Sequence, residues 1–326
     1  MRNMLASFKP LHHVAAAVLI LAAGAVGLSS SANAESKLRV GKAVPEAFSF
    51  VPLDVGIQQG FFKKHGLDVE SIAFAGDAKL QQAMAADGID IALGSGPGMA
   101  FIAKGSPVKA IAAMAGPPLL LAIVVRPDGP KTAADLKGKK VSVSTAGSLT
   151  YWLVSETSRL QGWGTKGIEI QPMGAMPGQI AALKRGDVDG VIMDVGNAFD
   201  LEKRGEGRIL VRFTNIKDFI IHVIFATNKA IASRPDDLKN FLKGWFETIA
   251  YMRTHKAETV KIAGAVMHKD AEISARTYDE LMPMFSDDGK FSAKAMAVLT
   301  KSYVEMGTLP KEPDPKTLYT EAFLPK

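Results

Sequence analysis

The stretch from Val141 to Tyr151 could bind an anion. An alternating β-branched run passes into small polar residues and then into a helical pattern, which predicts a strand, a tight loop and a helix N-terminus. Free backbone N–H groups and the helix dipole favour negative charge at such a junction. Thr145, Gly147 and Ser148 are therefore candidate ligand-binding residues, with Gly147 allowing close approach to the backbone. An ordinary N-cap, in which Ser148 serves only its own helix, is the alternative.

Two loops nearer the N-terminus also follow predicted strands. The first carries Phe48 and Phe50, which could cover an apolar or planar part of a ligand or fold back into the core. The second carries Ser95 and Gly96, whose hydroxyl and amide could donate to polar ligand atoms or only shape a turn. Loops after the carboxyl ends of parallel strands gather at one edge of the sheet, so we expect these loops to share a crevice.

A further loop and one isolated histidine complete the candidate set. Asp194 and Asn197 follow another predicted strand, and Asp194 could accept a hydrogen bond from a ligand amine or brace its own loop. His222 lies on a strongly apolar strand and could reach the crevice, although a lone histidine is more often structural. None of the crevice loops contains Lys or Arg, so an anion would depend on backbone amides and on the helix dipole.

Alternating strands and helices must position these loops. Residues 38–93 predict strand, helix, strand, helix, strand in order, followed by another helix and the strand Val108–Met114. The order strand, helix, strand, helix, strand returns about 100 residues later. Two apolar strands, Leu119–Val125 and Phe219–Ala226, bracket the second unit and are expected to act as hinge strands. We therefore predict an α/β protein of two lobes, each a mainly parallel sheet flanked by helices. Residues 35–120 begin lobe 1, residues 121–220 form lobe 2, and residues 221–326 complete lobe 1 with C-terminal helices.

Signatures of enzymes, metal sites and nucleic-acid binding are weak. The chain has no Cys, and its histidines after residue 34 lack metal-ligand spacing, so we expect neither a metal nor a cofactor. The sequence contains no nucleophile elbow and no phosphate-binding P-loop. The net charge of +6 comes from scattered Lys and Arg with few aromatics between them, which argues against nucleic acid as a partner.

The N-terminus has the pattern of a secretory signal peptide. Arg2 and Lys9 precede an apolar run, Val14–Leu28, that is short for a membrane span, and Ala32 and Ala34 form an A-x-A cleavage signal. We expect cleavage after Ala34 and export of the mature chain to a periplasm. Because no Cys follows the signal, a lipidated N-terminus is not expected.

Several stretches resemble the solute-binding proteins of ATP-binding-cassette importers, within the group for sulfonates, taurine, nitrate and thiamine precursors. They are Val55–Val69, Gly88–Ala92, Leu136–Val141 and Gly186–Gly190. The resemblance implies a type II-like periplasmic binding protein, a monomer, that closes over a small molecule and delivers it to an inner-membrane permease. Its small-residue loop matches Thr145, Gly147 and Ser148, and its aromatic loop matches Phe48 and Phe50 in place.

The ligand and the role leave alternatives open. A small organic anion of sulfonate or carboxylate type is the preferred ligand, and a neutral heteroaromatic such as a thiamine pyrimidine precursor is favoured instead if Asp194 faces the ligand. A periplasmic sensor would have the same sequence features as a transport protein. The resembling group also includes fungal pyrimidine synthases with a cysteine-rich motif, so the absence of Cys argues against an enzyme.

Overall fold

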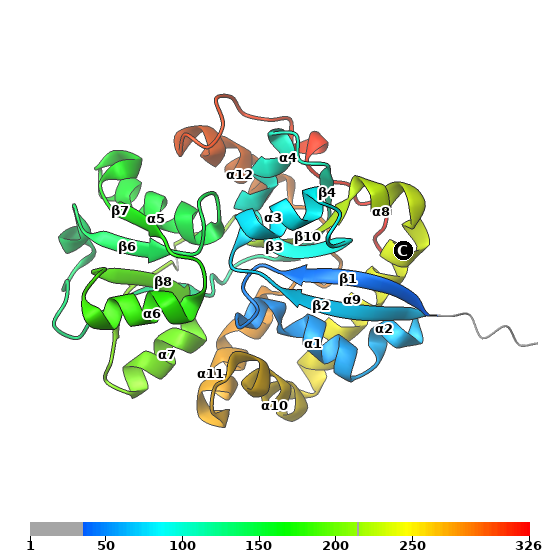
Figure 1. Ribbon diagram of the computed structural model, residues 1–326, viewed down its shortest axis with the longest axis horizontal. Coiled ribbons are helices and arrows are strands. Elements are labelled where there is room, and N and C mark those ends of the chain that lie inside the picture. The colour runs from blue at the N-terminus through cyan, green and yellow to red at the C-terminus, as the bar shows by residue number, and fades with distance from the viewer. Residues whose placement is uncertain (1–34, 214) are drawn as a thin grey trace, which may run out of the picture. The chain divides into compact units, whose positions relative to one another are not determined.

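The computed structural model describes residues 35–213 and 215–326, which belong to one compact unit. This unit contains two five-stranded sheets flanked by helices (Figure 1). The predicted signal peptide, residues 1–34, lies outside the described residues. No helix in the described part of the chain is long and apolar enough to cross a membrane.

The first sheet has the strand order β2-β1-β3-β10-β4. β1 (Ser36–Lys42) pairs in parallel with β2 (Leu67–Ala73) and with β3 (Ile91–Ser95). β10 (His222–Thr227) returns from the far part of the chain and runs antiparallel to both β3 and β4 (Val108–Ala115). The carboxyl ends of β1 and β3 therefore meet at one edge of this sheet.

The second sheet repeats this plan with the order β7-β6-β8-β5-β9. β6 (Lys140–Val143) pairs in parallel with β7 (Glu169–Pro172) and β8 (Gly190–Asp194). β5 (Leu121–Val125) runs antiparallel to β8 and to β9 (Arg208–Arg212). Each sheet thus has a single antiparallel strand among its described residues, which confirms the prediction of two mainly parallel sheets flanked by helices.

The two predicted hinge strands each belong to one sheet and not to both. Strand pairing starts only at Leu121 and at His222, so the residues just before them carry the chain between the sheets. Phe219, in the second connection, stacks on Trp152 of lobe 2 with ring centroids 4.3 Å apart. The lobe boundaries drawn from the sequence stay a prediction.

Helices cover both sheets, and the first expected helix is interrupted. Gly60 takes a left-handed φ of 76°, which separates α1 (Val51–Gln58) from α2 (Phe61–Lys64). The other helices are α3 (Asp77–Ala85), α4 (Ala100–Ala103), α5 (Leu149–Leu160), α6 (Met176–Arg185), α7 (Val195–Lys203), α8 (Asn228–Ser233), α9 (Pro235–Thr254), α10 (Lys256–Met267), α11 (Ala271–Leu281) and α12 (Ala293–Glu305). Of these, α7 and α8 were not predicted from the sequence.

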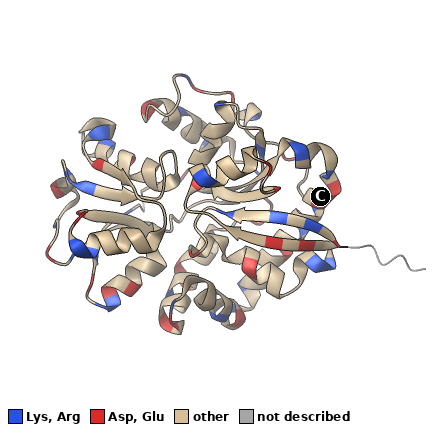
Figure 2. Cartoon of the chain, viewed as in Figure 1, with Lys and Arg blue, Asp and Glu red and all other residues tan. Residues whose placement is uncertain are grey.

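The core extends through both sheets, and the C-terminal helices complete the first. β3, β5 and β8 are buried along their whole lengths, as expected of central strands covered on both faces. α9 packs on α1 and α2, where Phe62 stacks on Phe241 at 5.0 Å. Trp245 is fully buried on the same helix, as its spacing of four from Phe241 predicts. In the cartoon of Figure 2, the positions of charged residues are scattered over helices, strands and loops and do not gather on one side of the view.

Candidate ligand-binding site

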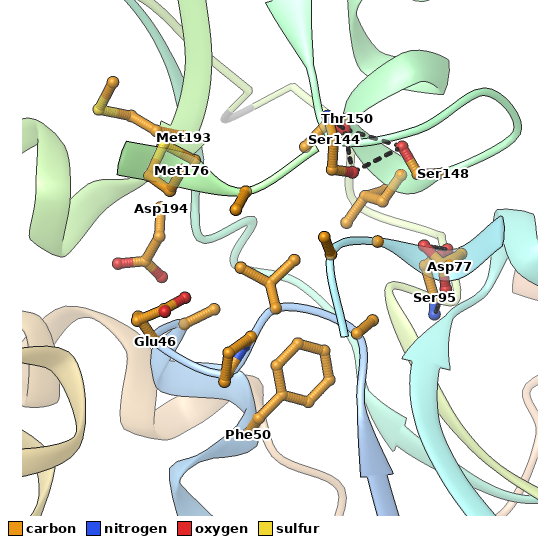
Figure 3. Close-up of a pocket in the computed structure, with 18 of the residues that line it drawn as sticks. Glu46, Phe50, Asp77, Ser95, Ser144, Ser148, Thr150, Met176, Met193 and Asp194 are labelled. Carbon is orange, nitrogen blue, oxygen red and sulfur yellow. Dashed lines mark hydrogen bonds between the residues drawn. The ribbon is translucent and has the colours of Figure 1, made fainter. Parts of the chain in front are cut away.

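A cavity of about 90 Å³ lies between the two sheets, and we call it the inner cavity (Figure 3). One water needs roughly 10–15 Å³ of such space, so the inner cavity has room for a small molecule of single-ring size. Its surface is mostly apolar, with carboxylates and hydroxyls at a few positions. This combination is typical of a small-molecule site.

The carboxyl ends of the parallel strands and the segments that follow them form most of the walls of the inner cavity, as the topology requires. The ends of β1, β3, β6 and β8 contribute Ala43–Ala47, Ser95, Ser144, Ser148–Thr150, Asp194 and Asn197, and the segments after β2 and β7 contribute Phe74–Asp77 and Gly174–Met176. The antiparallel strands begin at the same edges, because Leu121 pairs with Asp194 and His222 pairs with Ser95. Both sheets therefore contribute side chains to one space.

Three hydroxyls form a closed cluster on one wall. Ser144 Oγ donates to Ser148 Oγ at 3.1 Å, and Ser148 Oγ donates to the carbonyl of Thr145 at 2.7 Å. Thr150 Oγ1 lies 3.0 Å from Ser144 Oγ and 2.8 Å from Ser148 Oγ, and it accepts from the backbone N–H of Ser144. Ser148 also caps α5 by accepting from Tyr151 N. Thr150 Oγ1 can be the donor or the acceptor in its contacts with the two serines, so its hydroxyl can pair with a ligand atom of either kind.

Asp194 lies on the opposite side of the inner cavity, where Figure 3 shows its carboxylate together with that of Glu46. One oxygen, Oδ1, caps α7 by accepting from Gly196 N at 2.8 Å. The other, Oδ2, is buried and has no hydrogen-bond partner among the described residues. Burial raises the pKa of Asp194 to about 6, against the opposing effects of the Gly196 and Phe48 amides and of Lys269. A buried carboxylate that lines a cavity and has an unpaired oxygen favours a ligand that donates a hydrogen bond.

Among the residues that the structure describes, three carboxylates and no Lys or Arg line the inner cavity. Besides Glu46 and Asp194, Asp77 reaches the wall, but it already accepts from Ser95 N at 2.8 Å and from Ser95 Oγ at 3.0 Å. Burial raises the pKa of Asp77 above its usual range. Glu46 and Asp194 are thus the acids left to meet a ligand, and their charge disfavours an anion.

His222 forms the floor of the inner cavity with Phe50. Its ring lies 5.0 Å from that of Phe50 in an edge-to-face arrangement. Burial lowers the pKa of His222 to about 3, so the imidazole is neutral near pH 7. Nδ1 is buried without a hydrogen-bond partner among the described residues. A neutral imidazole can either donate to a ligand or accept from it.

Six of the ten residues selected from the sequence line the inner cavity. They are Phe50, Ser95, Ser148, Asp194, Asn197 and His222. The other four, Phe48, Gly96, Thr145 and Gly147, do not. Each of these four has a contact elsewhere that accounts for its position.

Phe48 and Gly96 serve the core and the connection between the sheets. The ring of Phe48 is fully buried between Tyr278 and Phe285, at centroid distances of 6.3 and 5.9 Å. Gly96 donates from its amide to Ile221 O at 2.9 Å, and a Cβ at this position would lie 1.9 Å from the carbonyl oxygen of Ile220. We therefore do not propose that Phe48 covers the ligand or that the Gly96 amide donates a hydrogen bond to it.

Thr145 and Gly147 belong to the β6–α5 loop but face away from the inner cavity. Thr145 Oγ1 accepts from Ala78 N at 3.3 Å, which joins this loop to the N-terminus of α3. Gly147 has a φ of 74° and lies nearest the ring of Phe101. The left-handed turn thus requires a glycine at this position. The central residue of the anion site predicted from this loop does not line the inner cavity.

The selection from sequence omitted Glu46, Asp77, Ser144 and Gln179, which all line the inner cavity. Glu46 and Asp77 follow β1 and β2, so they lie at the edge of the sheet where the loops gather. Their positions just after predicted strands could have indicated them from the sequence. Among the described residues, no group of three or more His, Asp or Glu is placed to hold a metal ion.

Comparison with known proteins identifies relatives and a common fold. The family described as "NMT1/THI5 like" matches residues 47–259. A curated relative from Haemophilus influenzae, named "Putative thiamine biosynthesis protein", is 36% identical over 94 residues. That match covers 28% of this chain and 30% of the relative, so the chain spans less than a third of the relative's length in the alignment.

Three solved structures share the fold at low sequence identity. The alkanesulfonate-binding protein SsuA from Xanthomonas axonopodis, bound to MOPS, has a TM-score of 0.74 and 17% identity, covering 86% of this chain and 95% of that one. The periplasmic nitrate-binding protein NrtA from Synechocystis has a TM-score of 0.70 and 16% identity, covering 88% and 87%. A DszB mutant in complex with biphenyl-2-sulfinic acid has a TM-score of 0.61 and 16% identity, covering 89% and 97%. The two-lobed fold of the periplasmic binding proteins is therefore shown.

Proposed function

Since the chain belongs to the NMT1/THI5-like family, we propose that it is the substrate-binding component of an importer and captures a small heteroaromatic amine. The observation that carries this proposal is the buried carboxylate of Asp194, which lines the inner cavity and whose Oδ2 has no hydrogen-bond partner among the described residues, in a wall where those residues supply no Lys or Arg. A ligand amine would donate to Asp194 or Glu46. Thr150 and His222 would bond to the remaining polar atoms of the ring.

The charges of the lining favour this ligand class over the anion expected first. A sulfonate or carboxylate in the inner cavity would lie near Glu46 and Asp194 without a compensating cation in the wall. The Ser148 hydroxyl that was expected to hold the anion donates to Thr145 O instead. An aminopyrimidine has single-ring size, an exocyclic donor and ring nitrogens that accept. The name of the curated relative, which includes thiamine biosynthesis, agrees with this chemistry.

Binding without turnover is part of the proposal. The hydroxyls of Ser144, Ser148 and Thr150 bond to one another and to the backbone, and none is paired with His222. A nucleophile normally needs a base within hydrogen-bond reach. Delivery to a membrane permease after export is proposed from the proteins of the same fold. If the signal peptide is cleaved after Ala34, N-terminal sequencing of the periplasmic protein should give Glu35 as the first residue.

A thermal-shift screen of the mature protein tests the ligand class. Near neutral pH, we expect a 4-aminopyrimidine to raise the melting temperature, by about 5 °C when its concentration is about 100 times its dissociation constant. The matched pyrimidine without the amine should have a smaller effect, because it cannot donate to Asp194. Ethanesulfonate and propionate should leave the melting temperature unchanged. Stabilisation by the sulfonate or the carboxylate alone would restore the anion as the ligand.

A further inference from the structure

α7 and α11 pack against each other, and they belong to different lobes (Figure 1). α7 follows β8 of the second sheet, and its cap residue Asp194 lines the inner cavity. α11 is fixed to the first lobe through Tyr278, whose ring lies 6.3 Å from that of Phe48 and whose hydroxyl donates to Met252 O at 2.7 Å. A change in the angle between the lobes would therefore separate these two helices.

One face of α11 carries charged side chains at every fourth residue. The three residues on this face are Glu272, Arg276 and Glu280. Glu272 Oε2 lies 2.6 Å from Lys203 Nζ, and Arg276 Cζ lies 3.5 Å from the centroid of the Phe199 ring. Since Phe199 and Lys203 are also four residues apart, the facing sides of α7 and α11 match along a turn of each helix.

Ion pairs extend this contact at both ends of α11. At its C-terminal end, Glu280 Oε2 lies 2.9 Å from Arg212 Nη2 on β9 of the second sheet. Just before its N-terminus, Lys269 Nζ lies 2.9 Å from Asp200 Oδ2 on α7. That pair is the most enclosed of the set, with 11% and 22% of the two side chains exposed. We call the contacts that Lys269, Glu272, Arg276 and Glu280 make with lobe 2 the interlobe strap.

The contacts of the interlobe strap are weak one by one, but they change together. Partly exposed ion pairs contribute little singly, and salt screens them. The Arg276 guanidinium over the Phe199 ring adds a cation–π attraction. Lys203 also pairs with Asp270, the cap residue of α11, at 2.9 Å. Because each contact has one partner in each lobe, all of them form or break in the same movement and act on one equilibrium.

We propose that the interlobe strap holds the two lobes closed over the inner cavity, so that salt as well as ligand sets the fraction of closed protein. This inference rests on the proposed function, because the strap regulates entry to the site where the amine binds. Strap and ligand act on the same helix, since Asp194 accepts from Gly196 N at the start of α7. Gly196 in turn adjoins α11, where its added Cβ would lie 3.1 Å from Thr277 Oγ1.

Small-angle scattering of the mature protein without ligand tests the interlobe strap directly. The screening length for charges falls from about 10 Å in 0.1 M salt to about 3 Å in 1 M salt. We expect the radius of gyration to increase between these two concentrations as the lobes separate, and to return to its lower value when the salt is removed. A radius of gyration that does not change with salt would overturn the proposal, and this test needs no variant.

A variant that keeps the net charge shows which residues hold the lobes together. Arg276→Gln with Glu280→Gln removes the cation–π contact and the pair with Arg212. Its radius of gyration in 0.1 M salt should match that of the unaltered protein in 1 M salt. Glu258→Gln with Lys261→Gln, which removes an i,i+3 pair within α10, is the matched control and should stay compact in 0.1 M salt. Equal radii for the two variants in 0.1 M salt would contradict the strap.

Affinity separates the interlobe strap from the proposed function. Apparent affinity falls with the fraction of protein in the binding-competent state, so the Arg276→Gln, Glu280→Gln variant should bind a 4-aminopyrimidine about three- to tenfold more weakly than the control. Neither residue lines the inner cavity. If salt opens the lobes but no aminopyrimidine binds, the proposed function fails and the strap is retained. If both variants bind the aminopyrimidine equally, the strap fails and the amine site is retained.

Discussion

Replacing Asp194 with Asn is expected to weaken the binding of a 4-aminopyrimidine by about 10- to 100-fold. Asp194 lines the inner cavity, and its buried Oδ2 has no hydrogen-bond partner among the described residues, so we expect the carboxylate to accept from a donor on the ligand. A hydrogen bond to a charged group contributes about 1.5–3 kcal/mol, which corresponds to this range of affinities. The measurement is calorimetric titration of both proteins above pH 7, where the wild-type carboxylate is ionised.

Asn is the appropriate replacement because its side-chain oxygen can still accept from Gly196 N and cap α7. The folded-state pKa of Asp194, about 6, lies above the usual value near 3.9, so its ionisation costs stability as pH rises between about 4 and 6. Above pH 6 the Asn variant should therefore melt at the same temperature as wild type or higher. A variant that melts lower and loses affinity in proportion would assign Asp194 to folding and not to the ligand.

Gly96→Ala is expected to destabilise the protein by more than about 3 kcal/mol, since its Cβ would have to displace backbone. The added carbon would lie 1.9 Å from Ile220 O, in the connection between the two sheets. The loop is held from the other side too, because Tyr303 Oη donates to Gly96 O at 2.9 Å. At about 2–4 °C per kcal/mol, the melting temperature should fall by about 10 °C.

Gly178→Ala provides the matched control. Gly178 lies in α6, and a Cβ there meets no heavy atom within 4 Å. Ala favours a helix over Gly by up to about 1 kcal/mol, so this variant should be as stable as wild type or slightly more stable. If Gly96→Ala melts like wild type and loses only ligand affinity, the glycine contacts the ligand, as the sequence first suggested.

Most strands of the two sheets were predictable because glycines in the sequence mark where helices end and strands follow. Gly66 and Gly186 have left-handed φ values that end helices before strands, and such glycines are readable in sequence. β9 was missed because it is short, half-buried and bounded by Arg208 and Arg212, so it shows no apolar alternation. The interruption at Gly60 was missed because Gly within a helical pattern does not by itself show a left-handed conformation.

The candidate site was predictable to the level of its loops, and less so to the level of side chains. The 3₁₀ turn at Phe48–Phe50 directs Phe48 into the core and leaves Phe50 on the cavity wall with Glu46. Ser95 lines the inner cavity, whereas the adjacent Gly96 meets Ile220. Such differences between neighbours depend on the backbone of each turn, which residue types and periodicity do not determine.

The most direct test of an ionised Asp194 facing a ligand amine is the pH dependence of affinity between pH 5 and 8. The probe should be an arylmethylamine, whose ammonium titrates near the range of lysine, about 10, and so keeps its charge. The other titratable groups around the inner cavity, among the described residues, are Glu46, Asp77, Lys269 and the neutral His222.

Calorimetry should show affinity that rises as pH increases through about 6, because the amine binds the ionised carboxylate and lowers its pKa. The affinity should level off above about pH 7, and Asp194→Asn should remove the rise. An affinity for the amine that falls as pH increases through the same range would contradict the account. Binding of ethanesulfonate but not of the amine, with an affinity that falls over that range, would contradict it as well.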